Sequence, residues 1–345
     1  MLYNKYRPTK IQDIVGQEHV KNVLLGINST DVPHTIVLYG PSGTGKTTAA
    51  RLIAKKIYCE NPTPEGDVCN ACAGCKLIDS GSTVDFLEID ATADSGVNFI
   101  RSLKERLNLT TLSGRRRIVY IDEAHNLSKK AFDALLKVLE ESKSNLFILS
   151  TTEYDKLPRT IKTRSFAIEF VSANYDEIKN LINKVSAYEG RKLDDTVQGL
   201  ISFASEGSYR KALVLLEDIL RQTKDKEITE DSLGSLKSIL NVEEADLMKS
   251  FIDAFFKVDW NVLMTIAKKL PPNDQKLRPM VQHMMNLAVN TVAKAAQTKK
   301  HPTKLDLARI EFIYELSSVL ENQNSSVTKS GVVKAIVALI KARYG

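Results

Sequence analysis

The sequence of 345 residues predicts an α/β domain around a parallel sheet, followed by a small helical domain and a second, all-helical domain. Three observations predict this order. A glycine-rich loop lies between an apolar strand pattern and a helical pattern, and two more apolar strand patterns follow. From residue 174 onward, apolar residues recur at intervals of three and four, which indicates helices. We expect domain boundaries at residues 1–172, 173–225 and 226–345.

The glycine-rich loop, Gly40–Thr47, fits the pattern G-x-x-x-x-G-K-[ST] at every fixed position. The strand pattern Thr35–Tyr39 precedes it and the helical pattern Thr48–Ile57 follows, and this context makes the motif specific. Such a loop surrounds phosphate oxygens with backbone N–H groups at the positive end of a helix. Lys46 is expected to place a positive charge on the phosphates, and Thr47 a hydroxyl on Mg²⁺. The predicted nucleotide-binding residues are Gly40, Pro41, Ser42, Gly43, Thr44, Gly45, Lys46, Thr47 and Thr48.

The four cysteines lie together in one short polar loop, at Cys59, Cys69, Cys72 and Cys75. Their spacing can supply all four ligands of a closed tetrahedral Zn²⁺ site. A reducing cytosol favours metal over disulfides. The alternative is that reduced cysteines act as small apolar residues, but these would be scattered through the core. We predict a structural zinc site in an insertion spanning residues 58–76.

A second strand pattern, Arg117–Ile121, runs directly into Asp122 and Glu123. Carboxylates at the carboxyl end of a parallel strand emerge beside the phosphate loop. Asp122 is expected to hold Mg²⁺ together with Thr47, and Glu123 to orient and polarise an attacking water. The alternative is an acidic pair that only caps the next helix.

A third strand pattern, Asn145–Ser150, is followed by Thr151 and Thr152. A hydroxyl at this strand end can touch the terminal phosphate or the attacking water. A basic segment, Leu157–Phe166, then precedes another strand.

Together these motifs resemble the AAA+ ATPases of the replicative clamp-loader clade. The four-cysteine insertion directly after the phosphate-loop helix makes the chain similar to the gamma/tau ATPase subunits of bacterial clamp loaders, including phage-encoded relatives. The resemblance spans nearly the whole chain. It is carried by Gly40–Thr47, Asp122–His125, Thr151–Thr152, Thr163–Ser165 and Gly207–Leu213, with Tyr6–Pro8 and Val15–Glu18 matching the amino-terminal signature.

The resemblance implies roles for individual residues. Thr152 would be the first sensor, with Thr151 as the neighbouring alternative. Arg164 matches the arginine finger that reaches the ATP of an adjacent subunit, and Arg210 matches the second sensor, which contacts the phosphates in cis. The family's usual Ser-Arg-Cys reads Thr163-Arg164-Ser165 here, so the arginine is kept while its neighbour differs. The adenine would lie against Tyr6, Arg7, Pro8, Val15 and Gly16.

The same resemblance implies the ATPase motor of a DNA sliding-clamp loader that uses ATP, Mg²⁺ and Zn²⁺. Its partners would be other clamp-loader subunits in a pentameric ring-like assembly, a sliding clamp and the backbone of primer–template DNA. Residues 226–345 would form the collar, without the long carboxy-terminal extension of the tau form. Two alternatives stay open. One is a catalytically weak, stator-like clamp-loader subunit, and the other is a helicase or branch-migration motor.

Charge and composition give less information about function than the motifs do. A net charge of +6 permits a nucleic-acid partner without requiring one. Arg101, Lys104 and Arg106, in a helix preceded by Ser95, and the run Arg115–Arg117 are candidate contacts to DNA phosphates. No apolar run approaches the roughly 20 residues of a membrane span, and the segment Met1–Pro8 lacks the apolar stretch typical of a signal peptide. A cytoplasmic protein is expected, on the nucleoid or in the host cytoplasm if phage-encoded.

Overall fold

The computed structural model describes residues 1–27, 32–81, 85–93, 95–107, 111, 116–142, 144–234, 240 and 250. The chain divides into two compact units, one of residues 3–173 and one of residues 1–2 with 174–345. The predicted collar, residues 226–345, lies outside the described residues apart from 226–234, 240 and 250.

The described part of the first unit contains a sheet of five parallel strands in the order β2-β3-β4-β1-β5. The strands are β1 (Thr35–Tyr39), β2 (Phe86–Asp90), β3 (Ile118–Asp122), β4 (Leu146–Thr151) and β5 (Phe166–Glu169). Because β4 lies between β1 and β3, the segments that follow these three strands meet at one edge of the sheet. We call this the carboxyl edge, and the opposite edge, where the strands begin, the amino edge.

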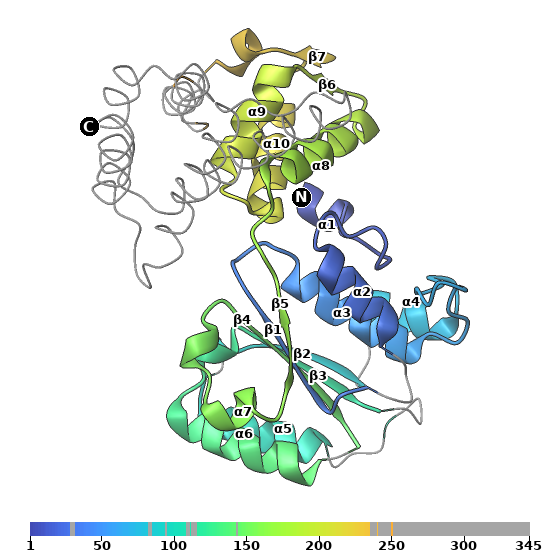
Figure 1. The fold of residues 1–345 in the computed structure, drawn as a ribbon, viewed down its shortest axis with the longest axis vertical. Coiled ribbons are helices and arrows are strands. Elements are labelled where there is room, and N and C mark those ends of the chain that lie inside the picture. Colours follow the sequence, from blue (N-terminus) through green and yellow to red (C-terminus); the bar gives the residue numbers. More distant parts are fainter. Residues whose placement is uncertain are drawn as a thin grey trace, which may run out of the picture. The chain divides into compact units, whose positions relative to one another are not determined.

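Helices cover both faces of this sheet (Figure 1). The helices on its faces are α2 (Glu18–Gly26), α3 (Lys46–Tyr58), α4 (Ala73–Asp79), α5 (Val97–Leu107), α6 (Lys129–Glu141) and α7 (Arg159–Lys162), with short 3₁₀ turns at Ala124–Asn126 and Tyr154–Lys156. A further short helix, α1 (Leu2–Lys5), lies at the start of the chain. Among the described residues, no helix is long and apolar enough to cross a membrane. The parallel sheet with helices on both faces confirms the predicted α/β class.

The inner strand β1 shows why the inner strands of the sheet are continuous apolar runs in the sequence. Ile36 and Leu38 pack in the cluster that includes α2, α3 and α4, whereas Val37 packs in the cluster that includes α5, α6 and α7. All three side chains are fully buried. A strand covered on both faces needs apolar residues at successive positions, as in other parallel sheets.

The edge strand β2 was not predicted. Only its first side chain, Phe86, is buried, and Glu88 and Asp90 are exposed. Its position at the end of the strand order leaves one side unpaired, so its sequence lacks the apolar run of the inner strands.

The second unit begins with three helices, α8 (Tyr175–Tyr188), α9 (Asp195–Ala204) and α10 (Tyr209–Gln222). Asn174, Asp194 and Ser208 cap their amino termini with side-chain hydrogen bonds, which satisfy N–H groups left free at a helix start. Two short strands, β6 (Lys192–Leu193) and β7 (Glu227–Ile228), pair in parallel and are followed by the 3₁₀ turn Glu230–Leu233. The sequence predicted only helices here, because strands of two residues have no readable period.

Candidate functional site

The glycine-rich loop starts at the carboxyl edge, where three strands meet. The backbone N of Gly40 donates to the carbonyl of Thr151 over 3.2 Å, and the N of Phe170 donates to the carbonyl of Tyr39 over 2.7 Å. Gly40 has φ +136°, and a Cβ there would lie 2.0 Å from the carbonyl oxygen of Phe170. Glycine is therefore required at the first position of the loop for reasons of space as well as of backbone angle.

Lys46 is 6% exposed, and its ammonium is held inside the curve of the loop. Its Nζ donates to the carbonyls of Gly40 and Pro41, at 2.7 and 2.8 Å. Gly45, at φ +110°, precedes the first turn of α3 and offers no side-chain cap. The amino end of α3 and a buried ammonium thus face the same loop, which is the arrangement that binds phosphate.

The two predicted magnesium ligands contact each other. Thr47 Oγ1 donates to Asp122 Oδ2 over 3.2 Å, although 75 residues separate them. Ser150 Oγ donates to Asp122 Oδ1, which also accepts from the backbone N of Glu123 over 3.0 Å. The hydroxyl of Tyr120 lies 3.2 Å from Thr47 Oγ1 and 2.9 Å from Ser150 Oγ. Hydroxyl and carboxylate oxygens of this kind suit Mg²⁺.

Sequence reasoning did not single out Tyr120 and Ser150 as part of this group. Burial, together with the negative charge of Asp122, raises the pKa of Tyr120, so its hydroxyl stays a neutral hydrogen-bond donor. A signal was present in each strand. Tyr120 precedes Asp122 by two positions, the strand period, and Ser150 is a polar residue within an otherwise apolar run.

Glu123 lies beside Thr152. Its backbone is left-handed, with φ +48°, and its Oε2 accepts from Thr152 Oγ1 over 3.3 Å. His125, which was not among the predicted site residues, places Nδ1 3.4 Å from Glu123 Oε2 and 3.0 Å from Thr151 Oγ1. Thr151 is fully buried, whereas Thr152 is partly exposed, so Thr152 is the threonine with its hydroxyl at the surface of the site.

The structure places the remaining predicted nucleotide contacts in three segments. Tyr6, Arg7 and Pro8 are half-buried, and Arg7 Nη2 donates to Asn4 Oδ1 over 3.0 Å. Val15 and Gly16 are half-buried just before α2, and Thr48 is half-buried in the first turn of α3. Arg210 is exposed in the first turn of α10, in the second unit.

Arg164 lies at the amino edge of the sheet. It precedes β5 by two residues, and the first residue of β5, Phe166, pairs with Ile36 near the start of β1. The loop Gly40–Thr47 follows the other end of β1, about 16 Å away for five residues at about 3.3 Å each. Arg164 is therefore remote from the nucleotide loop of its own chain.

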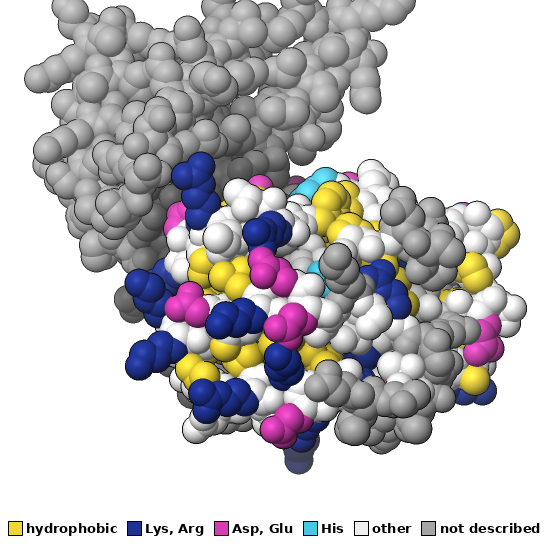
Figure 2. Space-filling model, turned by 90° about the horizontal axis from the view of Figure 1, so that it is seen from below, with side chains coloured by type: hydrophobic (Ala, Val, Ile, Leu, Met, Phe, Trp, Pro, Cys, Tyr) yellow, Lys and Arg dark blue, Asp and Glu magenta, His cyan; other side chains and the backbone are white. Residues whose placement is uncertain are grey.

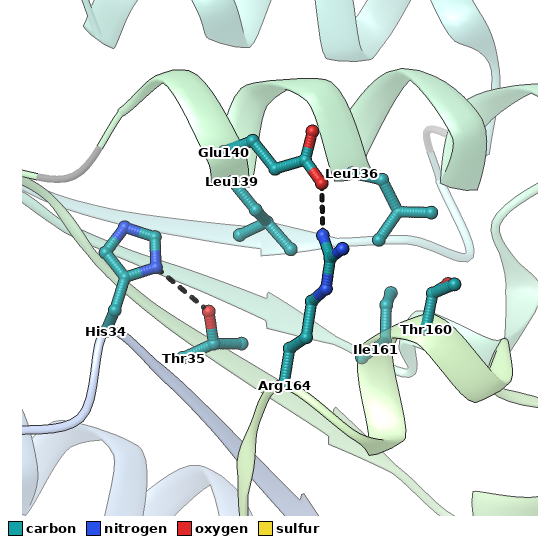
Figure 3. A pocket seen from close by; sticks show the side chains of 8 residues that line it. All are labelled: His34, Thr35, Leu136, Leu139, Glu140, Thr160, Ile161 and Arg164. Atoms are coloured by element: carbon teal, nitrogen blue, oxygen red, sulfur yellow. Dashed lines mark hydrogen bonds and ion pairs between the residues drawn. The ribbon is translucent and has the colours of Figure 1, made fainter.

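Figure 3 shows the surroundings of Arg164. Its side chain extends over a hollow of about 80 Å³ and forms an ion pair with Glu140 of α6. The two side chains are 61% and 59% exposed. An exposed pair contributes little to stability, so Arg164 is free to exchange Glu140 for another anion.

The four cysteine sulfurs lie within 4.8 Å of one another, and those of Cys69 and Cys75 are 3.9 Å apart. Zn–S bonds of about 2.3 Å in a tetrahedron place sulfurs about 3.8 Å apart, so the four residues fit Zn²⁺. Hydrogen bonds from the backbone N–H groups of Ala71 and Cys72 lower the pKa of the Cys69 thiol to about 6. The thiolate form that binds metal is thus favoured at this residue.

The basic residues predicted to contact DNA differ in exposure. Arg101, Lys104 and Arg106 are exposed on α5, and Lys104 pairs with Glu141 over 2.6 Å. Figure 2 shows this side of the unit, where Lys and Arg are interspersed with Asp and Glu.

The two described residues of the predicted basic run before β3, Arg116 and Arg117, do not form an exposed group. Arg117 is 2% exposed, with Nη2 3.7 Å from the buried carboxylate of Asp85, so the prediction that it contacts DNA is wrong. Arg116 is partly buried and donates to the carbonyls of Val32, Ser144 and Asn145. Arg115 lies outside the described residues.

Comparison with known proteins finds relatives among the subunits of DNA polymerase III. Residues 16–174 match the family described as DNA polymerase III, delta subunit. The chain is 38% identical to DNA polymerase III subunit gamma/tau of Mycoplasma pneumoniae, over 99% of this chain and 54% of the relative. It is 34% identical to DNA polymerase III subunit gamma of Buchnera aphidicola subsp. Schizaphis graminum, over 78% of this chain and 74% of the relative. The chain spans about half the length of its Mycoplasma and Bacillus relatives.

Among solved structures, the chain is similar to the RuvB Holliday junction branch migration motor of Thermotoga maritima. The TM-score is 0.52 at 19% sequence identity, with 77% of this chain and 86% of that chain covered. A likeness at this identity shows the fold alone, which is an AAA+-like α/β fold with a parallel sheet.

Proposed function

The chain belongs to the family of DNA polymerase III gamma/tau subunits, and on that premise we propose that it is the ATPase motor of a DNA sliding-clamp loader. ATP binding would drive clamp opening and primer–template binding, and hydrolysis would release the clamp on DNA. The observation that carries the proposal is the 3.2 Å hydrogen bond between Thr47 and Asp122, which joins the two nucleotide motifs at one edge of the sheet.

Each predicted residue has a place in nucleotide binding under this proposal. The loop Gly40–Thr47 and the ammonium of Lys46 hold the phosphates, and Thr47 and Asp122 hold Mg²⁺. The bound Mg²⁺ supplies charge neutralisation at the phosphates. The adenosine part lies against Tyr6, Arg7, Pro8, Val15 and Gly16, and Arg210, in the small helical domain of residues 173–225, contacts the phosphates.

Hydrolysis follows from the groups beside this loop. Glu123 accepts a proton from the water that attacks the terminal phosphorus, while the bond from that phosphorus to the ADP oxygen breaks. The hydroxyl of Thr152 donates to Glu123, and in this proposal Thr152 senses the terminal phosphate. Negative charge develops on the phosphoryl oxygens and the leaving ADP, and Lys46 and Arg210 are the cations of the same chain that meet it in this proposal.

A further cation comes from a neighbouring subunit in this proposal. Arg164 is remote from its own loop and exposed, so it suits the site of an adjacent subunit in a ring. The proposal includes a pentameric ring-like assembly with other clamp-loader subunits, a sliding clamp and the backbone of primer–template DNA, in the cytoplasm of a cell or a phage host. The site Cys59, Cys69, Cys72 and Cys75 holds a structural Zn²⁺.

A stator-like subunit without catalysis is less well supported, because such a subunit has no need for the complete set of Lys46, Thr47, Asp122 and Glu123. The steady-state ATPase rate, measured with partner subunits, clamp and primer–template DNA added in turn, tests the proposal. We expect clamp and DNA together to stimulate the rate. An ATPase rate indifferent to both would contradict clamp loading.

A further inference from the structure

A buried carboxylate connects the cysteine loop (residues 58–76) to the amino-terminal segment of the chain. Asp67 is 1% exposed. Its Oδ1 accepts from the backbone N of Ile11 over 3.0 Å and of Val68 over 2.7 Å, and its Oδ2 accepts from the N of Gln12 over 3.0 Å. A buried charge needs such partners, and hydrogen bonds to a carboxylate are stronger than those between neutral groups. Asp67 therefore fixes the backbone of residues 11–12 to the loop that holds the cysteines.

A second connection lies beside the first and includes helix α3. Asn70, which has a left-handed backbone at φ +58°, donates from Nδ2 to Thr9 Oγ1 over 3.2 Å. Its Oδ1 accepts from Lys55 Nζ over 2.9 Å, and the same ammonium pairs with Asp79 of α4 over 2.7 Å. Thr9 is thus held by the residue that follows Cys69 directly.

The other end of this segment is fixed next to the nucleotide loop. Gln17 is 4% exposed, its Nε2 donates to the carbonyl of Val171 over 2.6 Å, and its Oε1 accepts from the N of Val171 over 3.2 Å. Phe170, the preceding residue, has the carbonyl that a side chain at Gly40 would strike. Residues 9–17 are therefore fixed at one end to the cysteine loop and at the other to the start of the nucleotide loop.

We propose that the cysteine loop positions the amino-terminal segment for the adenosine part of the nucleotide, with Asp67 as the main positioning residue. The inference rests on the proposed function, because it needs Tyr6–Pro8, Val15 and Gly16 to contact adenosine. The inference predicts different effects on the binding of two parts of the ligand. The phosphates are held by the loop Gly40–Thr47, which Asp67 does not touch, whereas the adenosine contacts flank the residues that Asp67 fixes. A loop that only stabilised the fold would affect both parts alike.

The first test compares Asp67→Asn with wild type in calorimetric titrations of MgATP and of magnesium tripolyphosphate, which lacks adenosine. The side-chain amide introduced by this substitution has an NH₂ group, which is itself a donor and cannot accept from the backbone N–H groups. We expect the Kd for ATP to rise about tenfold, the size of one lost charge-assisted hydrogen bond, and the Kd for tripolyphosphate to stay within about twofold. Glu65→Gln, the same change at an exposed position of the cysteine loop, should alter neither. Equal losses for the two ligands, or no loss for ATP, would overturn the inference.

The zinc content of Asp67→Asn shows whether the substitution disturbs the metal site. If it does, a second variant keeps the test decisive. Asn70→Gly keeps the left-handed backbone and removes the contacts to Thr9 and Lys55, so it should raise the Kd for ATP in the same selective way. Independently of nucleotide, zinc chelation of the wild-type chain should speed amide hydrogen exchange in residues 9–17 and leave β3 and β4 unchanged. Unchanged exchange in residues 9–17 would overturn the inference. A wild-type chain that binds neither ligand would overturn the proposed function itself, and the inference with it.

Discussion

The two edges of the sheet in the first unit carry opposite kinds of functional residue. At the carboxyl edge, Thr47, Asp122 and Ser150 form a connected and largely buried hydrogen-bond group beside the nucleotide loop. At the amino edge, Arg164 is exposed and has Glu140 as an exposed partner. Under the proposed function, the first edge would hold the nucleotide without an arginine from the amino edge of its own chain, because Arg164 is remote from the nucleotide loop. The central claim of the proposal is therefore that a complete active site needs two chains.

The largest expected effect comes from removing the arginine at the amino edge. Arg164→Ala should lower the ATPase rate of the assembled complex by about 10³–10⁵-fold, because an arginine supplied by a neighbour stabilises developing phosphoryl charge. The isolated chain has no neighbour, so its ATP affinity and basal rate should stay at the wild-type level. Arg159→Ala, an exposed arginine of the same segment, is the control. An equal loss in the isolated chain would show that Arg164 acts within its own subunit.

A smaller effect is expected at the carboxyl edge when the base is removed. Glu123→Gln keeps the shape of the side chain but cannot accept the proton of water, so we expect the rate to fall about 10²–10⁴-fold with ATP binding retained. Glu153→Gln makes the same change on an exposed carboxylate of that edge and should have little effect. Single-turnover hydrolysis with bound radiolabelled ATP separates the two variants. A large loss of rate in both variants would show that the effect comes from the negative charge at the carboxyl edge and not from a general base.

The buried hydroxyl of Ser150 should affect the ATPase rate through the binding of Mg²⁺. Ser150→Ala removes a donor to Asp122 and leaves the hydroxyl of Tyr120 with one partner fewer. We expect the Mg²⁺ concentration for half-maximal ATPase to rise about 10–100-fold, as for other residues that orient metal ligands. Ser80→Ala, a serine that donates to a helix carbonyl, is the control. A lower rate at saturating Mg²⁺ with unchanged Mg²⁺ dependence would contradict this role.

The smallest effect is expected at the partner of Arg164. Glu140→Gln removes an exposed ion pair, so the stimulated ATPase rate should change by less than about fivefold. A measured loss as large as that of Arg164→Ala would mean that Glu140 holds the arginine in its working position, and the amino edge would then be as well organised as the carboxyl edge.

The contrast between the edges also explains what the sequence could predict. Thr47 and Asp122 were found because each belongs to a motif with a fixed place relative to a strand, and parallel strands bring such places together. Tyr120 and Ser150 lie inside strands, where burial in the core is the ordinary explanation of a residue. Their role depends on β4 lying between β1 and β3, which is a property of strand order and not of local pattern.

The amino edge was harder to predict for the same physical reason. Arg164 was assigned by resemblance, but its ion pair with Glu140 and its distance from the nucleotide loop depend on tertiary packing. Arg117 shows the reverse case. It belongs to a basic run that suggests a surface patch, yet Asp85 accompanies it in the interior, and no charge count along the chain distinguishes the two situations.

The most direct test of the central claim is a complementation measurement of ATPase activity in the assembled complex. Lys46→Ala lacks a working nucleotide loop but keeps the arginine, and Arg164→Ala keeps the loop but lacks the arginine. Each variant alone, with partner subunits, clamp and primer–template DNA, should be nearly inactive. If the active site is shared between chains, complexes assembled from a mixture of the two variants should regain a measurable part of the wild-type rate. A mixture as inactive as its components, or full activity of Arg164→Ala alone, would contradict the shared site.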